Sequence, residues 1–222
     1  VFALPSVFKV NVYTGSTTRL ERGKRSIRDW VVDRQHNVRV GITLDYDSGE
    51  RHVLLKEDDS WRTLFSYNAM SEKGEMPLGF GLDPNILYYR GYKGDYKALF
   101  TINLETNEHT EIFSDEGYDV DGSLIYSPVT NDAIGIRHLG RHYWDERYVA
   151  LQNGLDQALA DYSNTLVSFS RDENNYIVYS ESDEILVVSI TGHRTLPIRA
   201  TRYFALTLEV LRVTASTLRK AR

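Results

Sequence analysis

The chain has 222 residues, of which 41% are hydrophobic and 26% are charged, and it contains no cysteine. This composition can build a sizeable core and excludes a disordered chain, while the missing thiols exclude disulfides and thiolate metal sites. The net charge of −5 argues against general binding of nucleic acid, and no apolar run approaches the roughly 20 residues of a transmembrane helix.

The start of the chain and its composition set the first expectations. The chain begins at Val1 without an initiator Met, so we expect it to begin inside a longer protein or after a removed leader. Tyr, Thr, Val and Ile recur between Gly, Asn and Asp, which is typical of short strands separated by tight turns.

An alternating apolar pattern with a Thr-Gly turn predicts a hairpin over residues 7–20. The same order of strand, Asn, turn and Thr recurs over 99–112, and a weaker copy over 185–196 has Thr191 and Gly192 at its expected turn. Gly and Asn tolerate the positive φ that such turns need. The first two copies are separated by about twice the length of a four-stranded repeat of 40 to 50 residues.

A second element, a short strand followed by a polar turn and another strand, recurs between these hairpins. It is found over residues 30–40, 79–88, 125–134 and 167–178. Four short antiparallel strands per repeat are typical of a β-propeller blade. We therefore predict an all-β fold over residues 1–200, a partial β-propeller of about four to five four-stranded blades, with a β-sandwich as the alternative.

Residues 146–160 interrupt the β pattern. Tyr148, Leu151 and Leu155 follow helical spacing, and Asp145 is placed to cap the N-terminus. This predicts an inserted amphipathic helix that packs against the propeller edge, or alternatively one that borders a substrate entrance or a partner surface.

The end of the chain differs in charge from the rest, since residues 192–222 carry seven Lys or Arg residues and one Glu. We interpret residues 201–222 as a linker that leaves the propeller, with a disordered end as the alternative.

The sequence contains no Gly-x-Ser-x-Gly elbow, no phosphate-binding loop, no dinucleotide-binding turn and no His-Glu-x-x-His helix. We therefore predict no catalytic residue and no cofactor in this chain. His138, His142 and Asp145 are the one group that resembles metal ligands. Because Gly140 places a turn between the two histidines, we favour a polar hairpin tip over a metal site.

Arg28 and Arg39 lie near one predicted inner strand pair. Either guanidinium could hold a substrate carboxylate, because its fork matches the two carboxylate oxygens. The alternative is an Arg–Asp pair that stabilises a turn.

Several segments resemble the propeller of one enzyme family. Residues 27–33 with 37–40, 58–64, 118–122 and 151–156 are similar to the propeller region of bacterial prolyl oligopeptidase family serine peptidases, nearest to the dipeptidyl aminopeptidase and acylaminoacyl-peptidase group. Residues 202–222 resemble the linker of that family into an α/β-hydrolase domain. The resemblance implies a seven-bladed propeller that admits short peptides and excludes folded proteins, and the family's catalytic triad has no counterpart here.

We therefore expect a non-catalytic propeller fragment that selects peptide substrates for a hydrolase domain in the parent chain. The alternative is a stand-alone propeller that binds a protein or a peptide. An incomplete ring exposes strand edges and blade faces, which predicts self-association of the fragment. The family occurs both in the cytoplasm and outside it, and we favour the periplasm.

Overall fold

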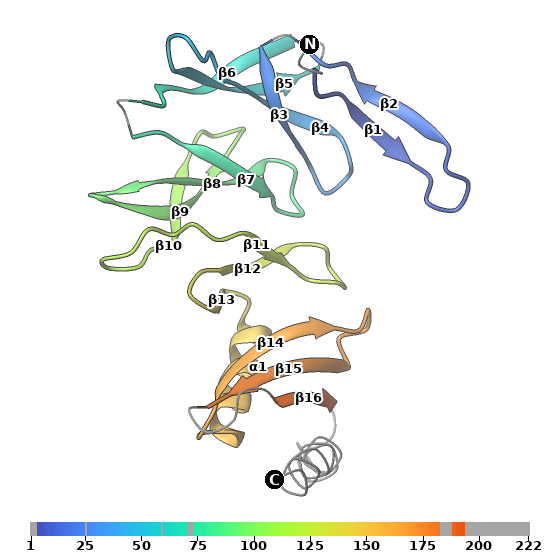
Figure 1. Cartoon of the computed structure of the whole chain (residues 1–222), viewed down its shortest axis with the longest axis vertical. Helices are drawn as coiled ribbons and strands as arrows, with labels where there is room; N and C mark the ends of the chain where they lie inside the picture. The colour runs from blue at the N-terminus through green and yellow to red at the C-terminus, as the bar shows by residue number, and fades with distance from the viewer. Residues whose placement is uncertain (1–3, 25, 59, 71–72, 183–187, 194–222) are drawn as a thin grey trace, which may run out of the picture. The chain divides into compact units, whose positions relative to one another are not determined.

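The computed structural model describes residues 4–24, 26–58, 60–70, 73–182 and 188–193. In this part of the chain the secondary structure consists of antiparallel sheets and one α-helix (Figure 1). This confirms the predicted all-β fold of propeller-type blades. The chain divides into two compact units, with the boundary after Leu124. The expected linker over residues 201–222 lies outside the described residues.

The first unit contains a two-stranded hairpin and two four-stranded sheets, whose strands are in sequence order. The hairpin comprises β1 (Val7–Val10) and β2 (Thr17–Glu21). The first sheet comprises β3 (Ile27–Val32), β4 (Val38–Thr43), β5 (Glu50–Glu57) and β6 (Ser60–Asn68). The second sheet comprises β7 (Met76–Phe80), β8 (Ile86–Lys93), β9 (Tyr96–Asn103) and β10 (His109–Phe113). This antiparallel meander is the strand order of a propeller blade.

Short polar side chains fix the turns between the predicted inner strands. In the β3–β4 turn, the Asp33 carboxylate accepts hydrogen bonds from the backbone N–H groups of Gln35 at 3.0 Å and Asn37 at 2.8 Å. His36 in the same turn has a φ of 69°, which lies in the left-handed region. In the β7–β8 turn, Asp83 accepts from the backbone N–H of Asn85 at 2.9 Å. Both hairpins therefore form at the positions that the repeat predicted.

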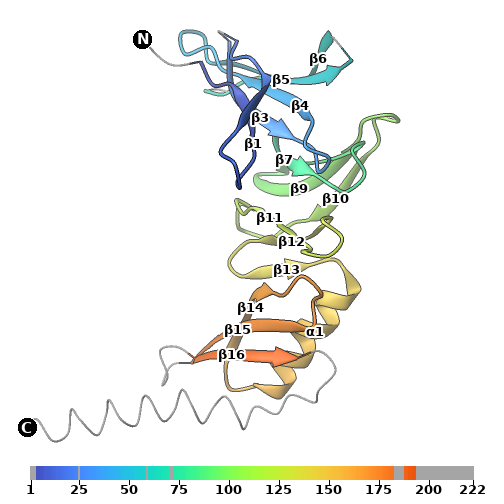
Figure 2. The ribbon, with the colours of Figure 1, turned by 90° about the vertical axis from the view of Figure 1, so that its right-hand side faces the viewer.

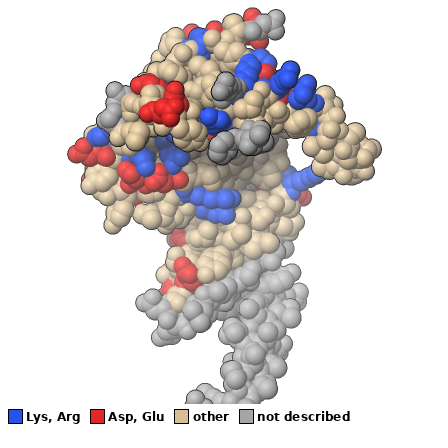
Figure 3. All heavy atoms as spheres, turned by 45° about the horizontal axis from the view of Figure 1, so that its top comes forward, with Lys and Arg blue, Asp and Glu red and all other residues tan. Residues whose placement is uncertain are grey.

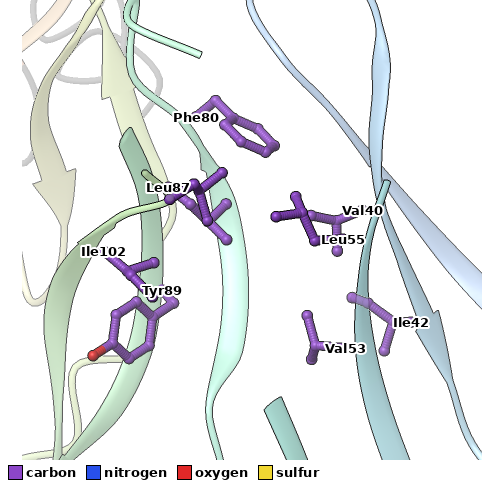
Figure 4. Close-up of a cluster of buried hydrophobic side chains, with 9 residues drawn as sticks. Val40, Ile42, Val53, Leu55, Phe80, Leu87, Tyr89 and Ile102 are labelled. Atoms are coloured by element: carbon purple, nitrogen blue, oxygen red, sulfur yellow. The ribbon is translucent and has the colours of Figure 1, made fainter. Parts of the chain in front are cut away.

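The core of the first unit lies between its two four-stranded sheets, because alternate residues of each strand face the other sheet. Figure 4 shows these side chains pointing toward one another from the two sheets. The buried cluster consists of Val40, Ile42, Val53, Leu55, Phe80, Leu87, Tyr89, Ile102 and Leu104. Each sheet thus buries a face that it could not cover alone.

Within its described residues, the second unit contains two three-stranded sheets and one helix. The third sheet comprises β11 (Leu124–Tyr126), β12 (Ala133–Arg137) and β13 (Arg141–Tyr143). The helix α1 (Glu146–Ala158) follows, and then β14 (Ser163–Phe169), β15 (Asn175–Glu181) and β16 (Val188–His193) form the last sheet.

The inserted helix forms where the sequence predicted it. The Asp145 side chain accepts a hydrogen bond from the backbone N–H of Arg147 at 2.9 Å and so caps the helix. Leu155 and Leu159 are buried in a cluster with Leu166 and Tyr176 of the last sheet, beside which α1 runs in Figure 2. The helix therefore packs against the last sheet. No helix in the described part of the chain is long and apolar enough to cross a membrane.

Two details differ from the prediction. Only two of the described sheets have four strands. The third sheet has three, because the chain continues from β13 into α1 where a blade would have its fourth strand. The predicted turn at Thr191 and Gly192 is wrong, since both residues lie within β16 and pair with Ile177 and Tyr176 of β15. A Thr-Gly pair permits a tight turn without requiring one, and the ladder with β15 keeps this segment extended.

Candidate functional site

Arg28 on β3 lines an open hollow of about 930 Å³ in the first unit. Its guanidinium carbon lies 5.1 Å from the centre of the Tyr46 ring, within the range of a cation–π interaction. The Nε atom of Arg28 is buried and has no hydrogen-bond partner, and the side chain forms no ion pair with any residue that the structure describes. Arg28, the predicted candidate, is therefore a cation that lines a hollow and whose guanidinium has no hydrogen-bond partner among the described residues.

Three carboxylates line the same hollow, from Asp45, Asp47 and Glu50 around the β4–β5 turn. Asp45 accepts the backbone N–H groups of Ser48 at 3.1 Å and Asp47 at 2.8 Å, and these bonds hold its pKa below the usual range. The side chains of Asp47 and Glu50 are exposed and form no ion pair within the described residues. The hollow therefore presents both a positive and a negative group to solvent.

Sequence reasoning missed the other walls of this hollow. Tyr46 lies in the β4–β5 turn and His52 lies on β5, where its Nδ1 is 2.9 Å from the Ser66 hydroxyl. The alternation along β5 was the available signal. Val53 and Leu55 point into the core, so His52 and Leu54 face the opposite side of the sheet.

Arg39, the second predicted candidate, has a different position and role. It lines a separate hollow of about 670 Å³, so the structure does not bring it together with Arg28. Its Nη1 lies 3.6 Å from the Asp33 carboxylate and donates to the backbone oxygen of Pro84 at 3.2 Å. Arg39 therefore forms the Arg–Asp pair of the alternative interpretation and also connects the turns of the two four-stranded sheets.

The weak metal candidates are engaged in local structure. The Nε2 atom of His142 donates to the backbone oxygen of His138 at 2.8 Å across the β12–β13 turn. Asp145 caps α1 and forms an ion pair with Arg147 at 2.8 Å, which holds its pKa low. Among the residues that the structure describes, no group of three His, Asp or Glu side chains is arranged to hold a metal ion.

A buried carboxylate in the second unit was not foreseen. Glu173 lies in the β14–β15 turn with a φ of 55° and is only 4% exposed. It accepts hydrogen bonds from the Ser127 hydroxyl at 2.7 Å and from the Tyr148 hydroxyl, and its other oxygen lies 3.9 Å from the Arg147 guanidinium. Burial, followed by the bond to Glu173, raises the pKa of Tyr148. This cluster joins two sheets and the helix, so its role is structural.

The charges on the face drawn in Figure 3 do not indicate a site. Figure 3 shows acidic and basic side chains intermixed over one face of the molecule. Broad electrostatic attraction of a polyanion needs charges of one sign to gather on a face. The candidate binding sites are therefore sought in the hollows and not in the charge distribution on this face.

The comparisons with known proteins show only distant likeness, and only among solved structures. No family model and no curated protein matches the chain. Among solved structures, the chain is similar to the crystal structure of TolB from Acinetobacter baumannii, with a TM-score of 0.44 and 10% sequence identity. The superposition covers 87% of this chain and 47% of the TolB chain, so this chain spans about half the length of that structure.

Proposed function

We propose that this chain is a non-catalytic propeller segment that binds short peptides and selects them for a hydrolase domain, as the resemblance to prolyl oligopeptidase family propellers implies. The observation that supports peptide binding is the hollow around Arg28. Its guanidinium has no hydrogen-bond or ion-pair partner in the described chain, and its Nε is buried.

The charges of this hollow match those of a short peptide. A guanidinium fork binds a carboxylate through two parallel hydrogen bonds, which suits the C-terminus of a peptide or an acidic side chain. Asp47 and Glu50 on the same hollow can pair with an ammonium group. Hydrogen bonds to charged groups contribute about 1.5–3 kcal/mol, and the Arg28 guanidinium has no partner among the described residues that would compete with a bound carboxylate.

Isothermal titration calorimetry with trialanine tests peptide binding. We expect the chain to bind trialanine and to bind its C-terminally amidated form at least about tenfold more weakly, which corresponds to about 1.4 kcal/mol. Arg28→Gln should lose at least as much affinity for trialanine. Arg62→Gln is the matched control, because Arg62 pairs with Glu57 on the surface and does not line the hollow. Equal affinity of Arg28→Gln and the unmodified chain would contradict the proposal.

The non-catalytic part of the proposal has its own test. Since the sequence has no nucleophile elbow, the purified chain should not turn over aminoacyl chromogenic peptides. Turnover that co-purifies with the chain and is abolished by a serine-reactive inhibitor would overturn this part and leave the binding site untouched.

The second candidate is a stand-alone propeller that binds a protein or peptide. The exposed apolar side chains of the first hairpin favour it, among them Phe8 at 52% and Val10 at 53% exposure. Sequencing the gene beyond codon 222 separates the candidates. A Gly-x-Ser-x-Gly elbow in frame, followed by Asp and His, supports the peptidase, whereas a stop codon directly after Arg222 supports the stand-alone propeller.

A further inference from the structure

A third hollow of the first unit is lined by basic and aromatic side chains. It has a volume of about 290 Å³ and lies where β5 and β6 of one sheet meet β7, β8 and β9 of the next. Three cations line it, Arg51, Arg90 and Lys97, and Tyr67 and Tyr92 contribute aromatic walls. No Asp or Glu is among the described residues that line it.

Arg51 is the cation of this hollow that lacks a carboxylate. Its Nη1 lies 3.5 Å from the Tyr67 hydroxyl and 3.7 Å from the sulfur of Met76, both long contacts to neutral groups. Its Nε is buried and has no hydrogen-bond partner. No ion pair joins Arg51 to an acid in the part of the chain that the structure describes.

The other two cations are held in place by acids that do not line the hollow. Arg90 Nη1 donates to the Asp121 carboxylate at 2.8 Å, and Lys97 Nζ lies 3.1 Å from Asp121 and 3.2 Å from Asp119. The hydrogen bonds of Asp121 and Asp119 raise the pKa of Lys97, so it remains charged at neutral pH. Arg90 keeps a second buried donor, because its Nε has no partner.

We propose that this hollow binds a small oxyanion, either a phosphate group or a carboxylate group, held by Arg51, Arg90 and Lys97. Guanidinium groups match the paired oxygens of both anions, and none of the described residues that line the hollow offers a competing carboxylate. The volume is at the lower limit of the roughly 300–1,000 Å³ of drug-sized pockets, which suits one anionic group better than a whole nucleotide.

This site is separate from the proposed peptide site. Arg28 and Arg51 line different hollows, and Arg51 is absent from the lining of the Arg28 hollow. The inference therefore does not depend on peptide binding at Arg28.

Titration of inorganic phosphate and of acetate into the ¹⁵N-labelled chain tests the proposal at the donors themselves. The arginine Nε–Hε resonances report each guanidinium directly. We expect saturable shifts of the Arg51 and Arg90 resonances and no comparable shift of Arg62, which does not line the hollow. Tighter binding of phosphate identifies a phosphate site, and tighter binding of acetate identifies a carboxylate site. The absence of saturable shifts with both anions, or equal shifts at Arg62, would overturn the proposal.

Variants provide the second measurement, by calorimetry at low ionic strength with the tighter anion. Arg51→Gln should weaken binding at least tenfold, and Arg51→Lys should recover only part of the loss because an ammonium lacks the fork. Arg62→Gln should bind like the unmodified chain. If Arg51→Gln unfolds, Lys97→Met takes its place, with the same expected loss. Affinities that are equal in the folded variants and the unmodified chain would refute the site.

Discussion

Replacing Tyr148 by Phe removes one hydroxyl from the buried cluster around Glu173 and leaves the ring in place. The ring contacts Tyr143 at a centroid distance of 5.4 Å and Phe169 at 5.0 Å, and Phe keeps both contacts. The lost hydroxyl donates to a carboxylate that is only 4% exposed. Hydrogen bonds to charged groups contribute about 1.5–3 kcal/mol, so we expect the free energy of unfolding to fall by that amount.

Urea unfolding followed by circular dichroism measures this loss. Tyr179→Phe is the matched control, because its hydroxyl donates at 3.1 Å to the exposed carboxylate of Glu181. Removing a solvent-exposed bond should change the free energy of unfolding by less than about 0.5 kcal/mol. The denaturant slope should remain the same in both variants. Equal losses in the two variants, or no loss in Tyr148→Phe, would refute the view that Glu173 stabilises the second unit.

Four further predictions concern stability and association. Leu87→Ala should lower the free energy of unfolding by about 2–5 kcal/mol, measured in urea, because Leu87 is fully buried between two sheets. Burial raises the pKa of Tyr89 to about 12. The free energy of unfolding that Tyr89 contributes below pH 10 should therefore be lost as the pH rises through about 12, and tyrosinate absorbance can follow the deprotonation. Hydrogen bonds from the Ser170 hydroxyl and then from Asn174 lower the pKa of Asp172 to about 2. The stability that Asp172 contributes above pH 4 should therefore be lost as the pH falls through about 2, and Asp172→Asn should remove this pH dependence. Phe8→Lys should reduce concentration-dependent association in light scattering, and a monomeric unmodified chain would contradict that expectation.

Much of the fold could be predicted from the sequence because its signals are local. Alternating apolar residues and short polar turns produce the same hairpin in successive repeats, and Asp145 caps the helix through a bond to its own neighbour Arg147. The prediction failed at Thr191 and Gly192, where pairing with β15 outweighs the turn preference of the dipeptide.

The candidate sites were less predictable because they depend on distant segments. Arg28 was predicted as a candidate from its residue type and its place on an inner strand. The hollow around Arg51 lies between strands of two sheets, and local sequence does not determine how these two sheets pack against each other. Glu173 in the β14–β15 turn accepts a hydrogen bond from Ser127 in the β11–β12 turn, and nothing near either residue in the sequence indicates that contact.

The two arginines that the sequence singled out should respond to mutation in opposite ways. Arg39→Met removes the bond to Pro84, the pairing with Asp33 and the contact of the guanidinium with the Phe80 ring. Because that bond is 3.2 Å long and the guanidinium is 23% exposed, we expect a loss of about 1.5 kcal/mol in urea unfolding, the lower end for a charged donor, with unchanged trialanine binding.

Arg28→Met removes only the interaction with the Tyr46 ring, which contributes about 0.5–1 kcal/mol at an exposed site. It should therefore unfold with a smaller loss than Arg39→Met and yet lose trialanine binding. Calorimetry and urea unfolding of the same two proteins decide which of the two arginines binds the peptide. If Arg39→Met lost the peptide and Arg28→Met kept it, the ligand would lie in the hollow beside His36 and Lys56, where Arg39 provides the guanidinium.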